Sequence, residues 1–102
     1  MRLTDYPLIV IMWSQEGCPA CEATLPKWRA VAERYAPCVP SVRLPVEEYA
    51  AAADHHRIKM LPTIMTLRNG MGGLRRLQGE QTLEEIEAFY AGAAMGLDCQ
   101  LG

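Results

Sequence analysis

The sequence has no long hydrophobic run and no large excess of charge of either sign. Its longest strongly apolar run, residues 7–13, is far too short to span a membrane. A net charge of −2 gives no electrostatic reason to expect nucleic acid or an anionic membrane as a partner. Residues 1–6 contain one basic residue and soon an acid, without the apolar stretch of a signal peptide. We therefore expect a reducing cytoplasmic location, where paired cysteines are more often catalytic or metal-binding than structural.

Internal repeats, linkers and a second domain are also missing. The chain has 102 residues, of which 50% are hydrophobic and 22% are charged, and this composition is typical of one globular domain. We expect a single domain over residues 1–95, a flexible tail over residues 96–102, and a monomer.

The first half of the chain alternates between strand and helix patterns. Residues 7–13 are continuously apolar and rich in β-branched side chains, which predicts a strand buried on both faces of a parallel or mixed sheet. Residues 19–35 repeat apolar side chains at helical spacing and predict a helix. Residues 39–46 predict a second strand, and its two prolines predict a place at the sheet edge because proline cannot donate to a strand ladder.

The second half predicts a helix, a hairpin and a closing helix. Residues 47–57 contain an alanine run that favours a short helix. Residues 62–68 and 73–78 predict two strands around Asn69-Gly70, a strong hairpin signal. The last helix is predicted to open at Thr82 with a capping box. The order β-α-β-α-β-β-α indicates the α/β class, with a four-stranded mixed sheet and helices on both faces.

The residues that carry chemistry lie at the first strand-to-helix turn. The stretch Gly17-Cys-Pro-Ala-Cys21, the helical Pro26 and the strand opening Met60-Leu-Pro-Thr63 together resemble the thioredoxin superfamily, over roughly residues 7–92. The resemblance is to a small thioredoxin-like or glutaredoxin-like dithiol oxidoreductase. It implies a thioredoxin-like fold and an enzyme that reduces protein disulfides and needs no cofactor besides its own Cys18–Cys21 disulfide. The implied partners are disulfide-containing proteins and an electron donor, either a thioredoxin-reductase-like protein or a thiol.

The positions of the two cysteines explain how such chemistry would work. Cys18 stands where the chain enters a helix, so the unpaired N–H groups and the helix dipole favour its thiolate. Cys18 is therefore the expected nucleophile, which forms a mixed disulfide with the substrate. Cys21, one turn further along, is expected to attack the Cys18 sulfur and release the reduced substrate.

The resemblance also implies a substrate groove beside the two catalytic cysteines. The Leu61–Pro62 peptide bond would be cis, and the backbone of Leu61 would pair with an extended substrate segment. Gly79 would flank this groove and allow a polypeptide to approach closely. Gly17 and Pro19, the neighbours of Cys18, complete the expected substrate-binding set.

Three departures from the family pattern modify these expectations. Only 17 residues precede Cys18, too few for the N-terminal strand and helix of full thioredoxins. The glycine-then-acidic glutathione signature of glutaredoxins is missing, which favours protein disulfides over glutathione. Residues 8–13 also lack the buried aspartate that serves the second cysteine as a proton acceptor in thioredoxins, so we expect slower release of substrate. With acidic neighbours around the motif, we expect a reduction potential at the reducing end of the family.

Other interpretations of the cysteines remain open. The pair could be half of a zinc site completed by Cys38, Cys99, His55 or His56, although no second CxxC or HxxxH is present. The chain could also be a thioredoxin-like binding module without turnover, or a glutathione-dependent glutaredoxin. We expect Cys38 to be a buried or half-buried filler and Cys99 an exposed free thiol, with a Cys38–Cys99 bridge as the alternative.

The remaining charged candidates have simpler explanations. His55 and His56 are predicted to end a helix, where cationic side chains favour the negative pole. Arg75 and Arg76 are expected on a solvated strand face. Arg43 lies where the family often has a lysine that favours a thiolate, and a solvated edge position is the simpler expectation.

Overall fold

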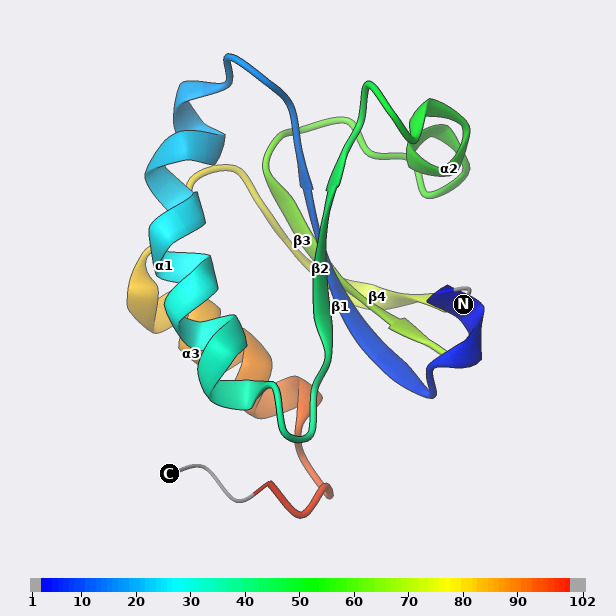
Figure 1. The fold of residues 1–102 in the computed structure, drawn as a ribbon, viewed down its shortest axis with the longest axis vertical. Helices are drawn as coiled ribbons and strands as arrows, with labels where there is room; N and C mark the ends of the chain where they lie inside the picture. The colour runs from blue at the N-terminus through cyan, green and yellow to red at the C-terminus, as the bar shows by residue number, and fades with distance from the viewer. Residues whose placement is uncertain (1–2, 100–102) are drawn as a thin grey trace.

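The computed structural model describes residues 3–99, and its elements follow the predicted order (Figure 1). A short 3₁₀ turn, Leu3–Asp5, precedes the first strand. None of the helices in this described part is long and apolar enough to cross a membrane. The elements are β1 (Leu8–Ser14), α1 (Pro19–Tyr35), β2 (Ser41–Pro45), α2 (Ala50–His55), β3 (Thr63–Arg68), β4 (Met71–Gln78) and α3 (Leu83–Ala93).

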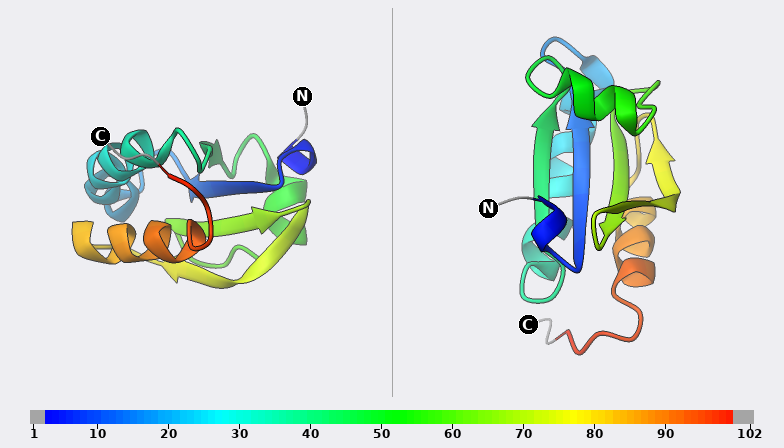
Figure 2. Two further views of the ribbon diagram at one scale, coloured as in Figure 1. Left: turned by 90° about the horizontal axis from the view of Figure 1, so that it is seen from below. Right: turned by 90° about the vertical axis from the view of Figure 1, so that its right-hand side faces the viewer.

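The four strands form one mixed sheet in the order β2-β1-β3-β4. The β1 and β2 strands are parallel, while β3 is antiparallel to both β1 and β4. The apolar first strand is therefore internal and the proline-bearing second strand is at the edge, as predicted. Helices cover both faces of this sheet, with α1 and α3 on one face and α2 on the other (Figures 1 and 2).

Alternation along β1 divides the core between the two faces. Leu8, Val10 and Met12 pack with the side chains of α1 and α3, whereas Ile9, Ile11 and Trp13 pack with those on the α2 side. All six are buried, which explains why this strand is apolar at every position. Between the helices, Trp28 Nε1 donates to the Tyr90 hydroxyl at 3.0 Å.

Local signals place the helix starts accurately. Pro19 is the first residue of α1, where its missing N–H needs no partner. Thr82 caps α3, and its side chain and that of Glu85 make the two reciprocal hydrogen bonds of a capping box. In contrast, α2 is shorter than predicted, because the chain around Tyr49 forms a turn without a side-chain cap.

The β3–β4 hairpin is tighter than predicted. Asn69 and Gly70 both have positive φ, 51° and 81°, as a two-residue type I′ turn requires. Strand β4 therefore begins at Met71 rather than at residue 73. The pairing of β3 with β4 is irregular between Met65 and Leu67, where the register shifts.

A second disulfide closes the far end of the fold. Cys38 follows α1, and its sulfur is bonded to that of Cys99, with Cα atoms 5.4 Å apart. The prediction of a free thiol at Cys99 and an unpaired filler at Cys38 is therefore wrong. Both side chains are half-buried and pack against the core cluster beneath α1 and α3, and sequence spacing alone did not reveal that they meet. Residues 100–102 of the predicted tail lie outside the described residues.

Candidate active site

The site is built where the ends of the strands meet. The end of β1 pairs with both neighbours, since Ser14 lies opposite Pro45 of β2 and Trp13 lies opposite Thr63 of β3. Thr63 in turn lies opposite Gln78, near the end of β4. The loop carrying Cys18, the turn after β2, the segment before β3 and the segment after β4 therefore emerge at one end of the sheet.

Cys18 is the N-cap of α1, and its sulfur accepts a hydrogen bond from the Cys21 backbone N–H at 3.2 Å. The two cysteines form a disulfide with Cα atoms 5.2 Å apart. Cys18 is partly exposed, whereas Cys21 is buried with 4% of its surface accessible. In the reduced state, the same N–H groups and the helix dipole favour a thiolate at Cys18 over a thiol.

The residues beside Cys18 give the turn its shape. Gly17 has a φ of +75°, which strains any residue with a side chain, although a Cβ there would meet no atom within 4 Å. Pro19 then begins the helix. The glycine is therefore explained by backbone conformation rather than by a lack of space.

The segment before β3 lies against the end of β4. The Leu61–Pro62 peptide bond is cis, and the Pro62 carbonyl accepts from the Gly79 N–H at 2.8 Å. Gly79 has a φ of +85°, and a Cβ there would lie 3.4 Å from the Met60 sulfur. Of the predicted site residues, Leu61, Pro62 and Gly79 are thus brought together by the sheet.

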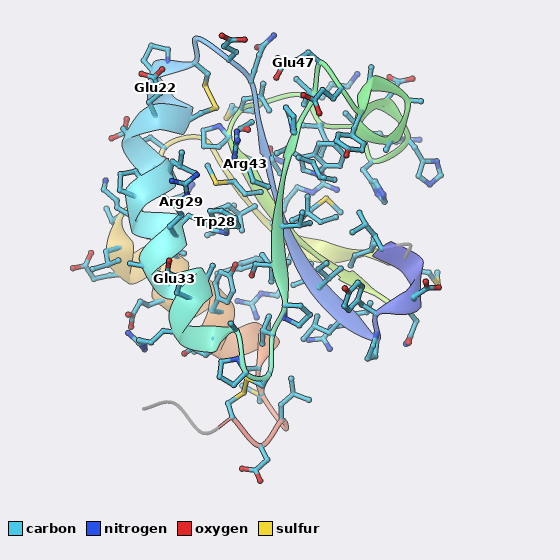
Figure 3. All side chains as sticks on the ribbon, viewed as in Figure 1. Glu22, Trp28, Arg29, Glu33, Arg43 and Glu47 are labelled. Atoms are coloured by element: carbon cyan, nitrogen blue, oxygen red, sulfur yellow. A yellow bond between two sulfur atoms is a disulfide. The ribbon has the colours of Figure 1, made fainter. Side chains whose placement is uncertain are left out.

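Two cavities flank this end of the sheet. A cavity of about 390 Å³ lies beside Leu61, with an apolar floor and a polar rim that includes Gln15 and Lys59. A second cavity, of about 320 Å³, lies beside Cys21. Figure 3 displays the side chains around this second cavity, including Arg43 on β2 and Glu47 in the turn that follows.

The cavity beside Cys21 is lined by Met12 and Arg43, and also by Glu47, which the sequence did not connect with the site. Met12 lines the cavity and is fully buried. This β1 position beneath the motif therefore carries no ionisable group. Arg43 also lines the cavity; this residue is exposed on the edge strand, as expected, and its Nη1 in addition donates to Ser14 Oγ at 3.2 Å. Glu47 Oε2 accepts from the Glu16 N–H at 3.4 Å across the same opening. Only the pairing of β1 with β2 brings these side chains to Cys21.

The cysteine pairing bears on the zinc alternative. Within residues 3–99, no three His, Cys, Asp or Glu side chains are grouped so that they could hold a metal ion. Cys38 and Cys99, two of the possible zinc ligands, are bonded to each other; Cys38 follows the C-terminal end of α1, whereas Cys18 caps its N-terminal end.

Comparison with solved structures gives the class of fold. The thioredoxin of Fasciola hepatica superposes with a TM-score of 0.74 at 22% identity, covering 84% of this chain and 80% of that one. The germline-specific thioredoxin Deadhead of Drosophila melanogaster gives 0.77 at 18% identity, with 87% and 83% covered. Human ERp44 gives 0.77 at 17% identity, but this chain covers 28% of its length. These likenesses establish a thioredoxin-like fold.

The sequence model of the thioredoxin family matches residues 2–91, which is most of the chain. The chain therefore belongs to the thioredoxin family. No curated protein matches the chain by sequence. A thioredoxin fold with a disulfide-bonded CxxC pair at the start of α1 is the arrangement of a thiol–disulfide oxidoreductase.

Proposed function

We propose that this chain is a protein-disulfide reductase that cycles between the dithiol and the disulfide of Cys18 and Cys21. The observation that carries the proposal is the position of the Cys18 sulfur. This sulfur accepts a hydrogen bond from the Cys21 N–H at the start of α1, and Cys18 is partly exposed to solvent. The Cys21 sulfur is close enough to form a disulfide with it. This position favours a nucleophilic thiolate that a substrate can reach.

The proposed cycle has two exchange steps. The Cys18 thiolate attacks one sulfur of the substrate disulfide, forming a mixed disulfide and releasing the other substrate sulfur as a thiolate, which takes up a proton. The Cys21 thiolate then attacks the Cys18 sulfur, forming the Cys18–Cys21 disulfide and releasing the second substrate sulfur. The substrate gains two electrons and the protein loses two. A thioredoxin-reductase-like protein or a thiol returns the protein to the dithiol form.

The substrate is proposed to lie along Leu61 as an extended segment. The cavity beside Leu61 has room for one substrate side chain, and its lining is a mixture of apolar and charged residues. Gly79, hydrogen-bonded to Pro62, borders the same segment without a side chain of its own. These features support a disulfide in a protein, rather than free glutathione, as the substrate.

The environment of Cys21 supports slow release and a reducing potential. Met12 offers no proton acceptor, and several carboxylates line the cavity beside Cys21 against the single cation of Arg43. Nearby negative charge disfavours a thiolate and so stabilises the disulfide relative to the dithiolate. A reduction potential above about −180 mV in a glutathione titration would contradict this part of the proposal.

The second disulfide bears on where the protein works. The sequence leads us to expect the cytoplasm, whereas a persistent Cys38–Cys99 disulfide is typical of an oxidising compartment. Thiol trapping in the native cells distinguishes the two locations. A trapped disulfide at these positions supports an oxidising compartment, and two free thiols support the cytoplasm.

Insulin reduction tests the function directly. We expect the dithiol form to cleave insulin disulfides when it is coupled to NADPH and a thioredoxin reductase, and less well when it is coupled to glutathione. Cys18→Ser should abolish turnover, because it removes the nucleophile. Cys21→Ser should accumulate a mixed disulfide that mass spectrometry detects.

The Cys38→Ala/Cys99→Ala variant is the matched control, since it removes a disulfide at the other end of α1. It should retain insulin reduction at a temperature where it is folded. Turnover that survives Cys18→Ser, or a failure of Cys21→Ser to trap substrate, would refute the proposed roles. A bound metal at a stoichiometry near one, without insulin reduction, would favour the binding-module alternative.

A further inference from the structure

A basic cavity of about 380 Å³ lies on the α2 side of the sheet, away from the cysteines. It is formed between the end of α2 and the β3–β4 hairpin. Its walls are His55, His56, Arg57 and Arg76 together with residues 70–72 of the hairpin turn. Four of these seven residues carry, or can carry, positive charge, and no carboxylate is among them.

The basic side chains are held by specific contacts. Arg76 Nη1 donates to the backbone carbonyl of His56 at 3.1 Å, which joins β4 to the end of α2. The His55 and His56 rings pack edge to face with centroids 5.0 Å apart. Gly72 leaves space for the His56 ring, because a Cβ there would lie 3.3 Å from Nδ1. Arg57, at a φ of +54°, turns the chain immediately after the helix.

These basic side chains are close to one another, and no carboxylate lines the cavity with them. The pKa of His56 is lowered, first by burial and then by the positive charges of His55 and Arg76. Neighbouring charged groups point elsewhere: Asp54 and Lys59 line the cavity beside Leu61, and Arg68 Nη2 donates to the Ala93 carbonyl. A negatively charged ligand would relieve this repulsion.

We propose that this basic cavity, defined by His55, His56, Arg57 and Arg76, binds a small oxyanion through a phosphate or carboxylate group. One N–H of Arg76 is used by the His56 carbonyl, which leaves the other guanidinium donors for a ligand. The cavity volume lies at the lower end of the range for small-molecule sites. Binding should strengthen as the pH falls, because protonated imidazoles add donors and charge.

Titration with inorganic phosphate, followed by the NMR signals of the His55 and His56 ring protons, tests the proposal. Ionic strength is held constant with chloride, and a parallel titration with succinate distinguishes a phosphate site from a carboxylate site. We expect saturable shifts of both histidines and a rise in the pKa of His56 with ligand bound. Arg76→Gln should weaken binding about tenfold, because it removes a charge-assisted donor.

Arg75→Gln is the matched control, because the Arg75 guanidinium lies over the Phe89 ring of α3 on the opposite face. It should bind phosphate as the unmodified chain does. Arg57→Gln, at an exposed position, tests the site without disturbing the Arg76–His56 contact and should also weaken binding. Circular dichroism and thermal unfolding of every variant report whether the fold is intact, so this test is independent of the redox proposal.

Three results would overturn the inference. The first is the absence of saturable shifts with both phosphate and succinate. The second is an equal loss of affinity in Arg75→Gln and Arg76→Gln, which would indicate diffuse surface charge. The third is unchanged affinity in a folded Arg57→Gln and a folded Arg76→Gln.

Discussion

The Cys38–Cys99 disulfide should contribute a large share of the stability of this domain. It joins positions 61 residues apart, and the chain-entropy treatment assigns about 4 kcal/mol to a loop of this length. A domain of this size has a free energy of unfolding of about 5–15 kcal/mol. Cys38→Ala/Cys99→Ala should therefore lower Tm by about 15–30 °C. The Cys18–Cys21 loop spans three positions, so its loss should cost only about 1.5 kcal/mol.

Thermal and urea unfolding, followed by circular dichroism without reductant, measure this difference. Alanine keeps both half-buried positions apolar, so the variant reports mainly the cross-link. The same pair of proteins compared in excess reductant supplies the control, and there the two stabilities should become nearly equal. A loss below about 1 kcal/mol in the oxidised comparison would refute the reasoning. Two free thiols at Cys38 and Cys99 in the oxidised protein would refute the pairing itself.

Three further predictions concern single side chains. Met12→Asp places a proton acceptor at the cavity beside Cys21 and should speed decay of the mixed disulfide about tenfold or more relative to the uncharged Met12→Asn. Stopped flow measures this decay, and equal rates in the two variants would contradict this role. Burial raises the pKa of Tyr90 to about 12, whereas the phenol in the unfolded chain ionises near 10. The stability that the buried neutral phenol contributes is therefore present below about pH 10 and is lost as the pH rises towards 12. Tyr90→Phe should lack this alkaline loss of stability, and it should lower the free energy of unfolding by about 1–3 kcal/mol at pH 7 because Trp28 Nε1 loses its acceptor. Parallel pH profiles of the variant and the unmodified chain in urea unfolding would argue against this role of Tyr90. Thr82→Ala should cost about 1 kcal/mol through loss of the α3 cap, and a urea midpoint that does not move would count against the capping box.

Much of the fold was readable from short-range patterns. Three local features were predictable: Pro19 at a helix start, the Thr82 cap and the Asn69-Gly70 turn. Each depends only on backbone conformation and hydrogen bonds among residues within four positions of one another. The edge position of β2 followed from its prolines, because a proline has no backbone N–H to donate to a neighbouring strand. The boundaries of α2 and β4 were less predictable, since turns and a bulge shift them by several residues.

The sequence by itself determined the fold class and the reactive pair, because Cys18 and Cys21 are three positions apart and a single helix turn sets their distance. Only the tertiary structure decided which distant side chains meet. The pairing of Cys38 with Cys99 and the approach of Arg43 to Ser14 depend on how separate elements pack. Such contacts depend on strand register and helix docking, which the periodicity of one segment does not specify.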